Sequence, residues 1–327
     1  MALKSTRRYL VVIAGMLLLV VGGVEVVRRI KAPKDTPSEL PASSERARNP
    51  FPREIKDATG ESLVISAKPQ RIVSQTLGTD EILLTICAPE RIVALSNFAD
   101  DPDVSNVVEL AKKVEARTTK GPEQILQLNP DLIFVASYSR AETVNLLKAS
   151  KAPVFRFANF DSIADIKTNI KTVGYATGCD VEADKLIERM DHELATIKAR
   201  IPSNRPPVSV MSYGREGYTA GSKTIFDDVV KAVGAVNVSA EHGITGFKKI
   251  SVEQIAEWQP DFVINGANIQ EMEAVRKKLL ADPVIGSSKA GRAGHILIID
   301  TRRFLTVSQF VTHFAEELAN GLYGKQK

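Results

Sequence analysis

The sequence has 327 residues, of which 44% are hydrophobic and 25% are charged, as is typical of a soluble globular protein with one large or two medium-sized cores. The net charge is +4, but residues 1–34 contain seven Lys or Arg and one Glu, so they carry +6 and residues 35–327 carry −2. Affinity for nucleic acids depends on clustered positive charge, so the composition argues against a nucleic-acid-binding protein.

The first segment, residues 1–30, has the pattern of an export signal or membrane anchor. Basic residues flank an apolar run from Leu10 to Val24. We favour an uncleaved anchor over a cleaved signal, because no small-residue cleavage motif precedes the next charges and no nearby cysteine could carry a lipid. In either case we expect the body of the protein on the periplasmic or other extracytoplasmic face of the cell membrane.

A tether and an N-terminal α/β lobe are predicted next. Residues 31–52 contain five prolines and no apolar period, which is typical of a disordered tether. Residues 53–180 indicate a hairpin, a strand–helix–strand unit over 68–96, and two later helices on either side of a strand. The strand–helix–strand unit favours a parallel sheet, because its two strands are joined by a helical crossover.

A long helix over 181–201 separates this lobe from a second one. Leu186, Met190, Leu194 and Ile197 form one apolar stripe along it. A helix of 21 residues is about 32 Å long, enough to cross between two lobes. Residues 202–327 form the C-terminal lobe, with a strand over 208–213, a helix beginning near Ser222, and later helices over 269–280 and 308–322 around the strand 295–300.

One segment occurs in both lobes. The pattern EQI, four residues, then PD begins at Glu123 and again at Glu253, and an apolar run follows each copy. Proline ends a helix and an apolar run suits a buried strand, so each copy predicts helix, tight turn and strand. The copies are 130 residues apart, which indicates two similar lobes. The predicted fold is α/β: two Rossmann-like lobes with mainly parallel sheets, joined by a single long α-helix.

Aromatic and arginine side chains follow several predicted strands. Open α/β sheets bind ligands at the carboxyl ends of their strands. Arginine offers a planar fork to carboxylates, and tyrosine offers a flat face with a polar tip, which together suit a large, partly anionic and partly apolar ligand. The candidate ligand-binding residues are Phe98, Tyr138, Arg140, Tyr213, Arg215, Tyr218 and Arg302.

The sequence contains no recognisable catalytic motif. It lacks GxSxG, HExxH, a GxxxxGK phosphate loop and a GxGxxG turn after a strand, and its four histidines are dispersed. We therefore predict no catalytic residue, no metal site and no cofactor. Cys87 and Cys179 would permit one disulfide in an oxidising compartment. We favour two separate buried thiols, one at the end of an apolar helix and one after Gly178.

From Arg53 to Tyr323 the chain resembles the class III substrate-binding proteins of bacterial ABC importers, which serve iron-siderophores, haem and vitamin B12. The resemblance rests on the run DATGESLVISAKPQRIVS, the two EQI segments, the long helix after Cys179, and the run YTAGSKTIFDDVVKAVGAVNV. It implies two lobes joined by one helix, a chelate ligand in the cleft between them, and no enzymatic activity. Its implied partners are a permease dimer and the cytoplasmic ATPase of that permease, and we expect a monomer.

The resemblance also implies roles for particular residues. Glu123 and Glu253 would dock against arginines of the permease. As acids in the first turn of a helix, they would also interact with the helix dipole without any partner.

The resemblance leaves the identity of the ligand open. Phe98 lies where vitamin B12 binders place an aromatic residue, but Ala136 lies where such a binder can carry Trp. Arg140 and Arg215 suit an anionic siderophore, and Tyr138 with Tyr213 could ligate haem. We expect an iron-siderophore or similar large chelate, with haem or cobalamin as the alternative. An alternative of another class is a membrane-anchored sensor or scaffold with the same fold.

Overall fold

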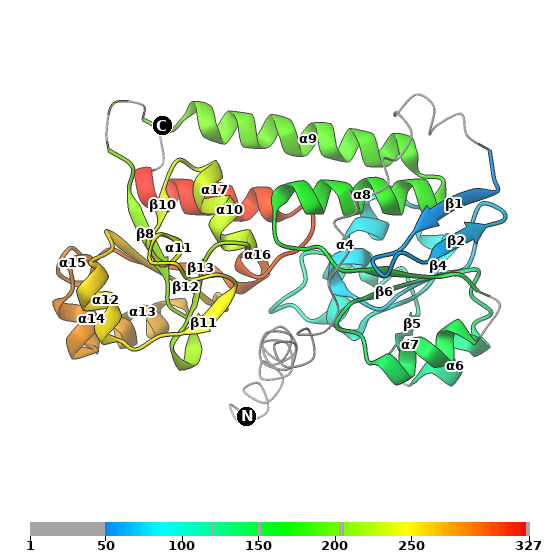
Figure 1. The fold of residues 1–327 in the computed structure, drawn as a ribbon, viewed down its shortest axis with the longest axis horizontal. Helices are drawn as coiled ribbons and strands as arrows, with labels where there is room; N and C mark the ends of the chain where they lie inside the picture. Colours follow the sequence, from blue (N-terminus) through cyan, green and yellow to red (C-terminus); the bar gives the residue numbers. More distant parts are fainter. Residues whose placement is uncertain (1–49, 119–120, 150–151, 203, 205, 325–327) are drawn as a thin grey trace. The chain divides into compact units, whose positions relative to one another are not determined.

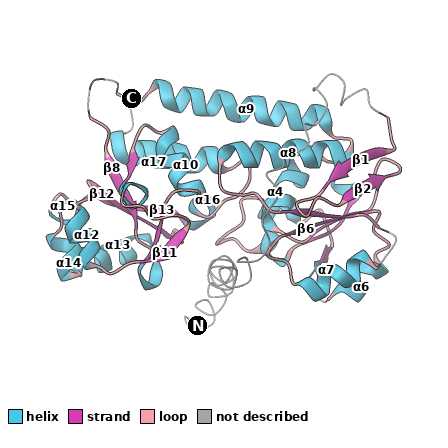
Figure 2. Cartoon of the chain, viewed as in Figure 1, coloured by secondary structure: helices cyan, strands magenta, loops and turns pink. Residues whose placement is uncertain are grey.

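The computed structural model describes residues 50–118, 121–149, 152–202, 204 and 206–324. The predicted anchor (1–30) and all but the last three residues of the predicted tether (31–52) lie outside them. Two parallel sheets organise the described chain (Figures 1 and 2). The first has the order β5 (Ala116–Arg117), β4 (Ile92–Leu95), β3 (Ile72–Ser74), β6 (Leu132–Ala136), β7 (Val154–Phe157). The second has the order β10 (Val236–Asn237), β8 (Ser209–Ser212), β12 (Phe262–Ala267), β13 (Ile296–Asp300).

We call the five-stranded sheet with its helices the N-terminal lobe and the four-stranded sheet with its helices the C-terminal lobe. The N-terminal helices are α4 (Leu77–Ile86), α5 (Val108–Ala111), α6 (Pro122–Gln127), α7 (Ala141–Lys148) and α8 (Ile163–Thr177), with 3-10 turns η2 (Pro89–Arg91) and η3 (Asn97–Asp100). The C-terminal helices are α10 (Ile225–Ala232), α11 (Val238–Glu241), α12 (Glu253–Trp258), α13 (Met272–Ala281), α14 (Pro283–Ser287), α15 (Lys289–Arg292), α16 (Thr301–Phe304) and α17 (Val311–Tyr323), with the 3-10 turn η5 (Arg215–Gly217).

The long helix is α9 (Asp180–Ala199), close to the predicted range 181–201. It packs against α8 of the N-terminal lobe and α17 of the C-terminal lobe (Figure 1). The turn before it is tight because Gly178, at φ 66°, ends α8 in the left-handed conformation that favours glycine. The predicted class, two α/β lobes with parallel sheets joined by one long helix, is confirmed.

The repeated segment folds the same way twice. In the first copy α6 leads through a turn into β6, and in the second α12 leads into β12. The turn aspartate of each copy braces the neighbouring strand. Asp131 accepts hydrogen bonds from the backbone N–H groups of Gln70 and Arg71, at 2.7 and 2.8 Å, just before β3. Asp261 accepts one at 2.8 Å from the backbone N–H of Ser209, the first residue of β8.

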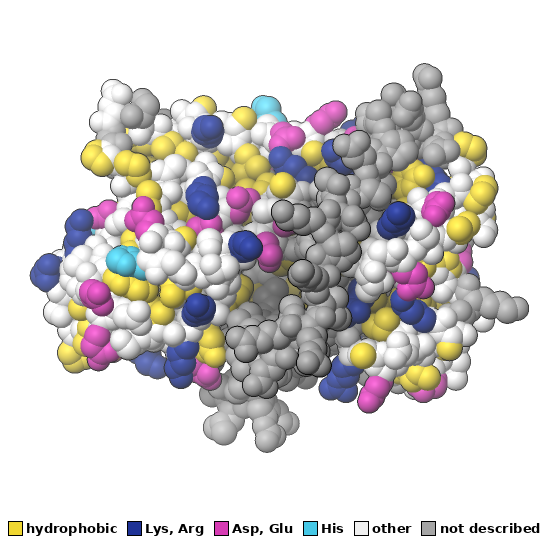
Figure 3. Space-filling model, in the orientation of Figure 1, with side chains coloured by type: hydrophobic (Ala, Val, Ile, Leu, Met, Phe, Trp, Pro, Cys, Tyr) yellow, Lys and Arg dark blue, Asp and Glu magenta, His cyan; other side chains and the backbone are white. Residues whose placement is uncertain are grey.

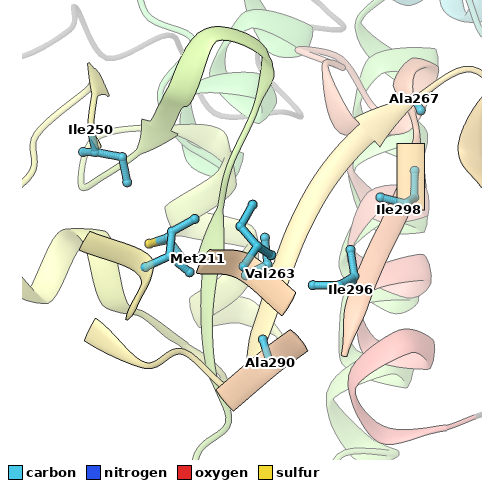
Figure 4. Packing of buried hydrophobic residues seen from close by; sticks show 9 residues of the cluster. Met211, Ile250, Val263, Ala267, Ala290, Ile296 and Ile298 are labelled. Atoms are coloured by element: carbon cyan, nitrogen blue, oxygen red, sulfur yellow. The ribbon is translucent and has the colours of Figure 1, made fainter. Parts of the chain in front are cut away.

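Each sheet buries an apolar core. In the C-terminal lobe Val263 is the register partner of both Met211 and Ile296, so three neighbouring strands place their side chains side by side (Figure 4). Helices α12, α14 and α15 add Ile255, Ile285 and Ala290 to this cluster. Most strand residues of this sheet are buried and none is exposed, as expected of a parallel sheet covered on both faces.

Several details differ from the predictions. Helix α10 starts two residues later than a cap at Ser222 would place it, because the side chain of Thr224 accepts the capping hydrogen bond, from the backbone N–H of Asp227. The predicted hairpin is present as β1 (Arg53–Lys56) paired with β2 (Ser62–Ile65). A second antiparallel pair, β9 (Tyr218–Ala220) with β11 (Phe247–Lys249), was not predicted, nor were α14 and α15.

The prediction that the two cysteines lie apart is wrong. Both are buried thiols, but their Sγ atoms are 2.8 Å apart. Cys87 follows the last residue of α4, and Cys179 precedes the first residue of α9. Helix packing between α4, α8 and α9 brings together two positions that are 92 residues apart in the sequence.

Candidate functional site

The carboxyl edge of the N-terminal sheet carries a row of polar and aromatic residues. All five strands are parallel, so the residues that follow them meet at one edge. Thr76 follows β3, Phe98 follows β4, Tyr138 follows β6 and Phe160 follows β7. Phe98 lies in η3 and is half-buried, whereas Arg140 is exposed immediately before α7.

Tyr138 is the most accessible aromatic residue of this row. Its side chain is 39% exposed, so a ligand can reach the ring. The ring lies 6.3 Å from that of Phe160, which lies 6.4 Å from the buried ring of Phe157, both distances between centroids. Phe157 continues the contact to Phe134 in the core, at 5.7 Å. A continuous set of aromatic contacts therefore supports the exposed ring from behind.

Two residues at the start of α4, Thr76 and Asp80, lie close to the hydroxyl of Tyr138. This hydroxyl contacts the side chain of Thr76, and Asp80 is close by. Desolvation raises the pKa of the Tyr138 phenol to about 12, and the Asp80 carboxyl adds to this, so the phenol is neutral at pH 7. Burial also raises the pKa of Asp80 to about 7, against opposing hydrogen bonds from Ser74 and Ser96. The phenol of Tyr138 therefore adds no charge to this part of the edge at pH 7, and the carboxyl of Asp80 is less readily ionised than an exposed aspartate.

In the C-terminal lobe, the predicted tyrosines lie in one turn. Tyr213 follows β8, Arg215 begins η5 and Tyr218 begins β9. Tyr213 is half-buried and packs against the core cluster of its own lobe. Desolvation raises the pKa of its phenol, and the acids Asp282 and Glu253 add to this. Tyr213 therefore contributes to packing at this edge, beside the start of α12.

The positive charge of Arg302 is compensated by the carboxylate of Asp300. Its guanidinium binds both carboxylate oxygens of Asp300, with Nε 3.1 Å from Oδ1 and 2.9 Å from Oδ2. The hydrogen bond to Asp300 raises the pKa of Arg302. Its carbonyl oxygen accepts a hydrogen bond of 3.0 Å from Asn106 of the N-terminal lobe. Because this arginine is already paired, the edge is less cationic than the sequence suggested.

Sequence reasoning missed three candidate apolar contacts. Phe160 is half-buried after β7, Ile269 is 58% exposed after β12, and Phe247 is 41% exposed at the start of β11. Phe160 and Ile269 could have been found by the rule that selected Tyr138, since each lies just beyond the carboxyl end of a buried strand. Phe247 could not, because the pairing of β9 with β11 has no clear signal in the sequence.

Glu123 and Glu253 are exposed acids in the first turns of α6 and α12. Each of these helices precedes its strand across a tight turn. A hydrogen bond from its own backbone N–H, and another from Ser251, lower the pKa of Glu253. Within the described part of the chain, neither carboxylate forms an ion pair.

Other kinds of site have little support in the described chain. Those residues contain no group of three or more His, Cys, Asp or Glu side chains placed to hold a metal ion. None of the helices within them is long and apolar enough to cross a membrane. On the face drawn in Figure 3, acidic and basic side chains are interspersed over both lobes. That distribution differs from the single-sign patch used to bind a phosphate backbone.

Known proteins of similar sequence and fold are binding proteins. A cobalamin-binding protein of Halobacterium salinarum is 24% identical over 279 residues, covering 84% of this chain and 74% of that protein. An uncharacterised ABC transporter substrate-binding lipoprotein of Bacillus subtilis, YvrC, is 25% identical over 236 residues, covering 70% and 73%. The crystal structure of a possible iron-binding, periplasmic solute-binding protein of Staphylococcus epidermidis has a TM-score of 0.69 at 21% identity, covering 78% of this chain and 99% of that one.

The sequence pattern of one protein family matches residues 72–302, which contain every strand of both parallel sheets; the hairpin of β1 and β2 and the final helix α17 lie outside the match. The match extends from β3 to the start of α16, so it contains both copies of the repeated segment and the whole of α9. The chain belongs to the periplasmic binding protein family.

Proposed function

We propose that this protein captures a large, flat metal chelate of the corrinoid type and delivers it to an ABC importer. A periplasmic binding protein acts outside the cytoplasm, and the protein is therefore extracytoplasmic. The observation that supports a flat ligand is the exposed ring of Tyr138, backed by Phe160 at the carboxyl edge of the sheet. Aromatic faces of this kind suit a macrocycle, with which they make extended apolar contact.

Of the candidate arginines, Arg302 is paired and Arg140 is exposed, so the site offers fewer free guanidinium groups than the sequence suggested and favours a weakly charged ligand over a strongly anionic siderophore. Arg302 is compensated by Asp300, and the phenol of Tyr138 is neutral. A strongly anionic chelate would need uncompensated arginines, because desolvating its charge is costly unless each charge is paired. The cobalamin-binding relative in Halobacterium salinarum supports the same choice.

Calorimetric titration of the purified protein tests the ligand. The panel is cyanocobalamin, haem, and ferric chelates of one catecholate and one hydroxamate siderophore. We expect binding of cyanocobalamin, and a Tyr138→Ala variant should bind it at least about tenfold more weakly, since an aromatic contact at a binding site is worth about 1–2 kcal/mol or more. Phe262→Ala is the matched control, because Phe262 is a half-buried aromatic residue at the opposite, amino end of β12.

The panel also separates the alternatives. Binding of a ferric siderophore or haem without cyanocobalamin would overturn the corrinoid assignment and leave the uptake function in place. An absence of binding across the panel would contradict the uptake function itself. In that case, co-purification of a signalling partner without a permease would support the sensor or scaffold.

Delivery requires a permease, and the repeated segments supply a contact for it. We assign docking to the exposed carboxylates of Glu123 and Glu253, one in each lobe at an equivalent place. The amino-terminal segment, residues 1–30, would hold the protein at the membrane, and residues 31–52 would act as its leash. The similarity to YvrC, an ABC transporter substrate-binding lipoprotein, supports this arrangement.

A further inference from the structure

Two cysteines meet where the interlobe helix begins. The Sγ atoms of Cys87 and Cys179 are 2.8 Å apart, and the side chains are 7% and 4% exposed. The contact joins residues 92 positions apart, so it depends on the completed fold of the lobe and not on a local turn. No other cysteine is present in the 327 residues, so each of these thiols has a single possible intramolecular partner.

The surroundings favour a reactive pair over two inert thiols. The guanidinium of Arg91 lies 3.2 Å from Sγ of Cys179, and its other hydrogen bonds, to the carbonyl oxygens of Pro69 and Thr177, hold it in place. The hydrogen bond from Cys87 lowers the pKa of the Cys179 thiol, with Thr177 and Arg91 acting in the same direction. The same hydrogen bond and burial raise the pKa of the Cys87 thiol. Cys179 therefore gives up its proton more readily than Cys87, and the two sulfur atoms are in contact, which is the arrangement that precedes disulfide formation.

We propose that Cys87 and Cys179 form a disulfide bond in the exported protein, which fastens the start of α9 to the end of α4. Disulfide bonds form and persist in extracytoplasmic compartments, because these are oxidising. The inference rests on the location of the protein and on the geometry of the pair, and it is independent of which ligand is bound.

Thiol–disulfide exchange with an oxidised dithiol supplies the chemistry. The Cys179 thiolate attacks one sulfur of the oxidant's disulfide, and the second sulfur of the oxidant leaves as a thiolate. Cys87 then loses its proton and attacks Sγ of Cys179, which releases the first sulfur of the oxidant. The protein loses two protons and two electrons, and the oxidant gains them and becomes a dithiol.

The bond would reinforce a junction that other contacts already hold. Arg53, in the first strand, donates a hydrogen bond of 2.7 Å to Asp180, and both side chains are buried. Arg91 joins η2 to the end of α8 through Thr177. With a covalent bond added at Cys179, the first turn of α9 becomes part of the N-terminal lobe. Any change in the angle between the lobes then has to occur towards the other end of α9.

Thiol counting on the full chain, exported into an oxidising compartment, tests the proposal directly. The protein is unfolded without reductant and treated with a maleimide that carries a polyethylene glycol chain, so that each free thiol adds a visible mass. We expect no labelling before reduction and two labels after it, and a non-reducing peptide map should contain the Cys87 and Cys179 peptides linked. Two free thiols in the unreduced protein would overturn the proposal.

Thermal unfolding provides a second measurement. Closing a long loop stabilises a protein chiefly by restricting the unfolded chain, so reduction should lower the Tm of the wild type by about 5–10 °C. The variant with Cys87→Ala and Cys179→Ala should have a Tm near that of the reduced wild type and should not respond to reductant. A wild-type Tm that is unchanged by complete reduction would contradict a stabilising disulfide bond between Cys87 and Cys179. If the double variant fails to fold, the labelling of the wild type still decides the question.

Discussion

Glu81, in the first part of α4, is a buried carboxyl group at the junction of the two lobes. Its Oε1 atom accepts hydrogen bonds of 2.9 Å from both the backbone N–H and the side-chain amide of Asn106, and Oε2 is hydrogen-bonded to Ser308 of the C-terminal lobe. The amide of Gln309 also donates to the carbonyl oxygen of Glu81, at 2.9 Å. Glu81 thus accepts hydrogen bonds from residues of both lobes.

The protonation of Glu81 should make stability depend on pH. Burial raises its pKa from 4.5 to about 7, although its hydrogen bonds oppose the shift. The folded protein therefore holds this proton more tightly than the unfolded chain does. The contribution of Glu81 to stability is full below pH 4.5, falls as the pH rises to about 7, and is constant above that. The total loss is about 3 kcal/mol, at 1.4 kcal/mol per pKa unit.

A Glu81→Gln variant should lack this dependence, because the amide does not titrate and keeps the shape of the neutral acid; its oxygen can accept from Asn106, and its NH2 group can donate to the oxygen of Ser308, whose hydroxyl donates to Glu81 in the wild type. Relative to the wild type, we expect the variant to gain up to about 3 kcal/mol between pH 4.5 and pH 8. The measurement is guanidinium unfolding at both pH values, with the exposed Glu188→Gln of α9 as the control. A difference between variant and wild type that is the same at both pH values would show that Glu81 does not titrate in this range.

At the scale of elements, the close approach of α8 and α9 depends on one glycine. A Cβ atom added at Gly174 would lie 2.5 Å from Cβ of Ala183 and 3.2 Å from the carbonyl oxygen of Cys179. Both neighbours are rigidly held, one within α9 and one in the backbone of the turn before it. A larger residue can be accommodated only if the two helices move apart.

Gly174→Ala should therefore destabilise the protein even though alanine is the better helix former. The gain in helix propensity is about 1 kcal/mol, whereas forcing a methyl group into a packed contact costs about 1–3 kcal/mol, and this site is at the upper end. We expect a net loss of about 1–2 kcal/mol in chemical unfolding. Thr168→Ala, on the exposed side of the same helix, should change stability by less than about 0.5 kcal/mol. Equal or greater stability of Gly174→Ala would show that α8 and α9 adjust without cost.

Sequence reasoning succeeded for elements that carry local signals. The Pro-Asp turns predicted both helix-to-strand connections, and the apolar stripe predicted the position of α9 to within two residues at each end. Sequence reasoning failed for contacts between segments that are far apart in the sequence. The contact of Cys87 with Cys179 depends on how three helices pack, and the pairing of β9 with β11 joins two short, partly exposed segments.

The sequence predicted where the candidate residues lie in the fold but not the charge that they carry, and their role in ligand binding stays a prediction. Tyr138 and Phe98 were found because residues beyond parallel strands converge on one edge. The sequence showed Asp300 two residues before Arg302, but not that its carboxylate would bind the guanidinium and so reduce the positive charge available to a ligand. The pairing of Arg302 with Asp300 is visible only in the folded structure.

For the whole molecule, docking through Glu123 and Glu253 can be separated from ligand binding. The variant with Glu123→Lys and Glu253→Lys should keep the ligand affinity of the wild type and lose uptake in cells, because two attractive contacts with the permease become repulsive. Ligand affinity is measured by calorimetry, and uptake by following labelled ligand into cells.

The control for docking reverses two other exposed acids. Glu182 lies in the first turn of α9, and Glu257 lies in α12 itself, near its end. Lysine at both positions changes the net charge by the same amount, so uptake should remain close to that of the wild type. Normal uptake by the variant with Glu123→Lys and Glu253→Lys would rule out the docking role.

The aspartate brace after each short helix has a mechanical consequence. A load applied by a partner at Glu123 passes along the six residues of α6 to Asp131, which holds the strand β3 as well as beginning the approach to β6. Asp261 does the same for β8 after α12. Force at either glutamate is therefore shared between two adjacent strands of a sheet, which opposes shear between those strands.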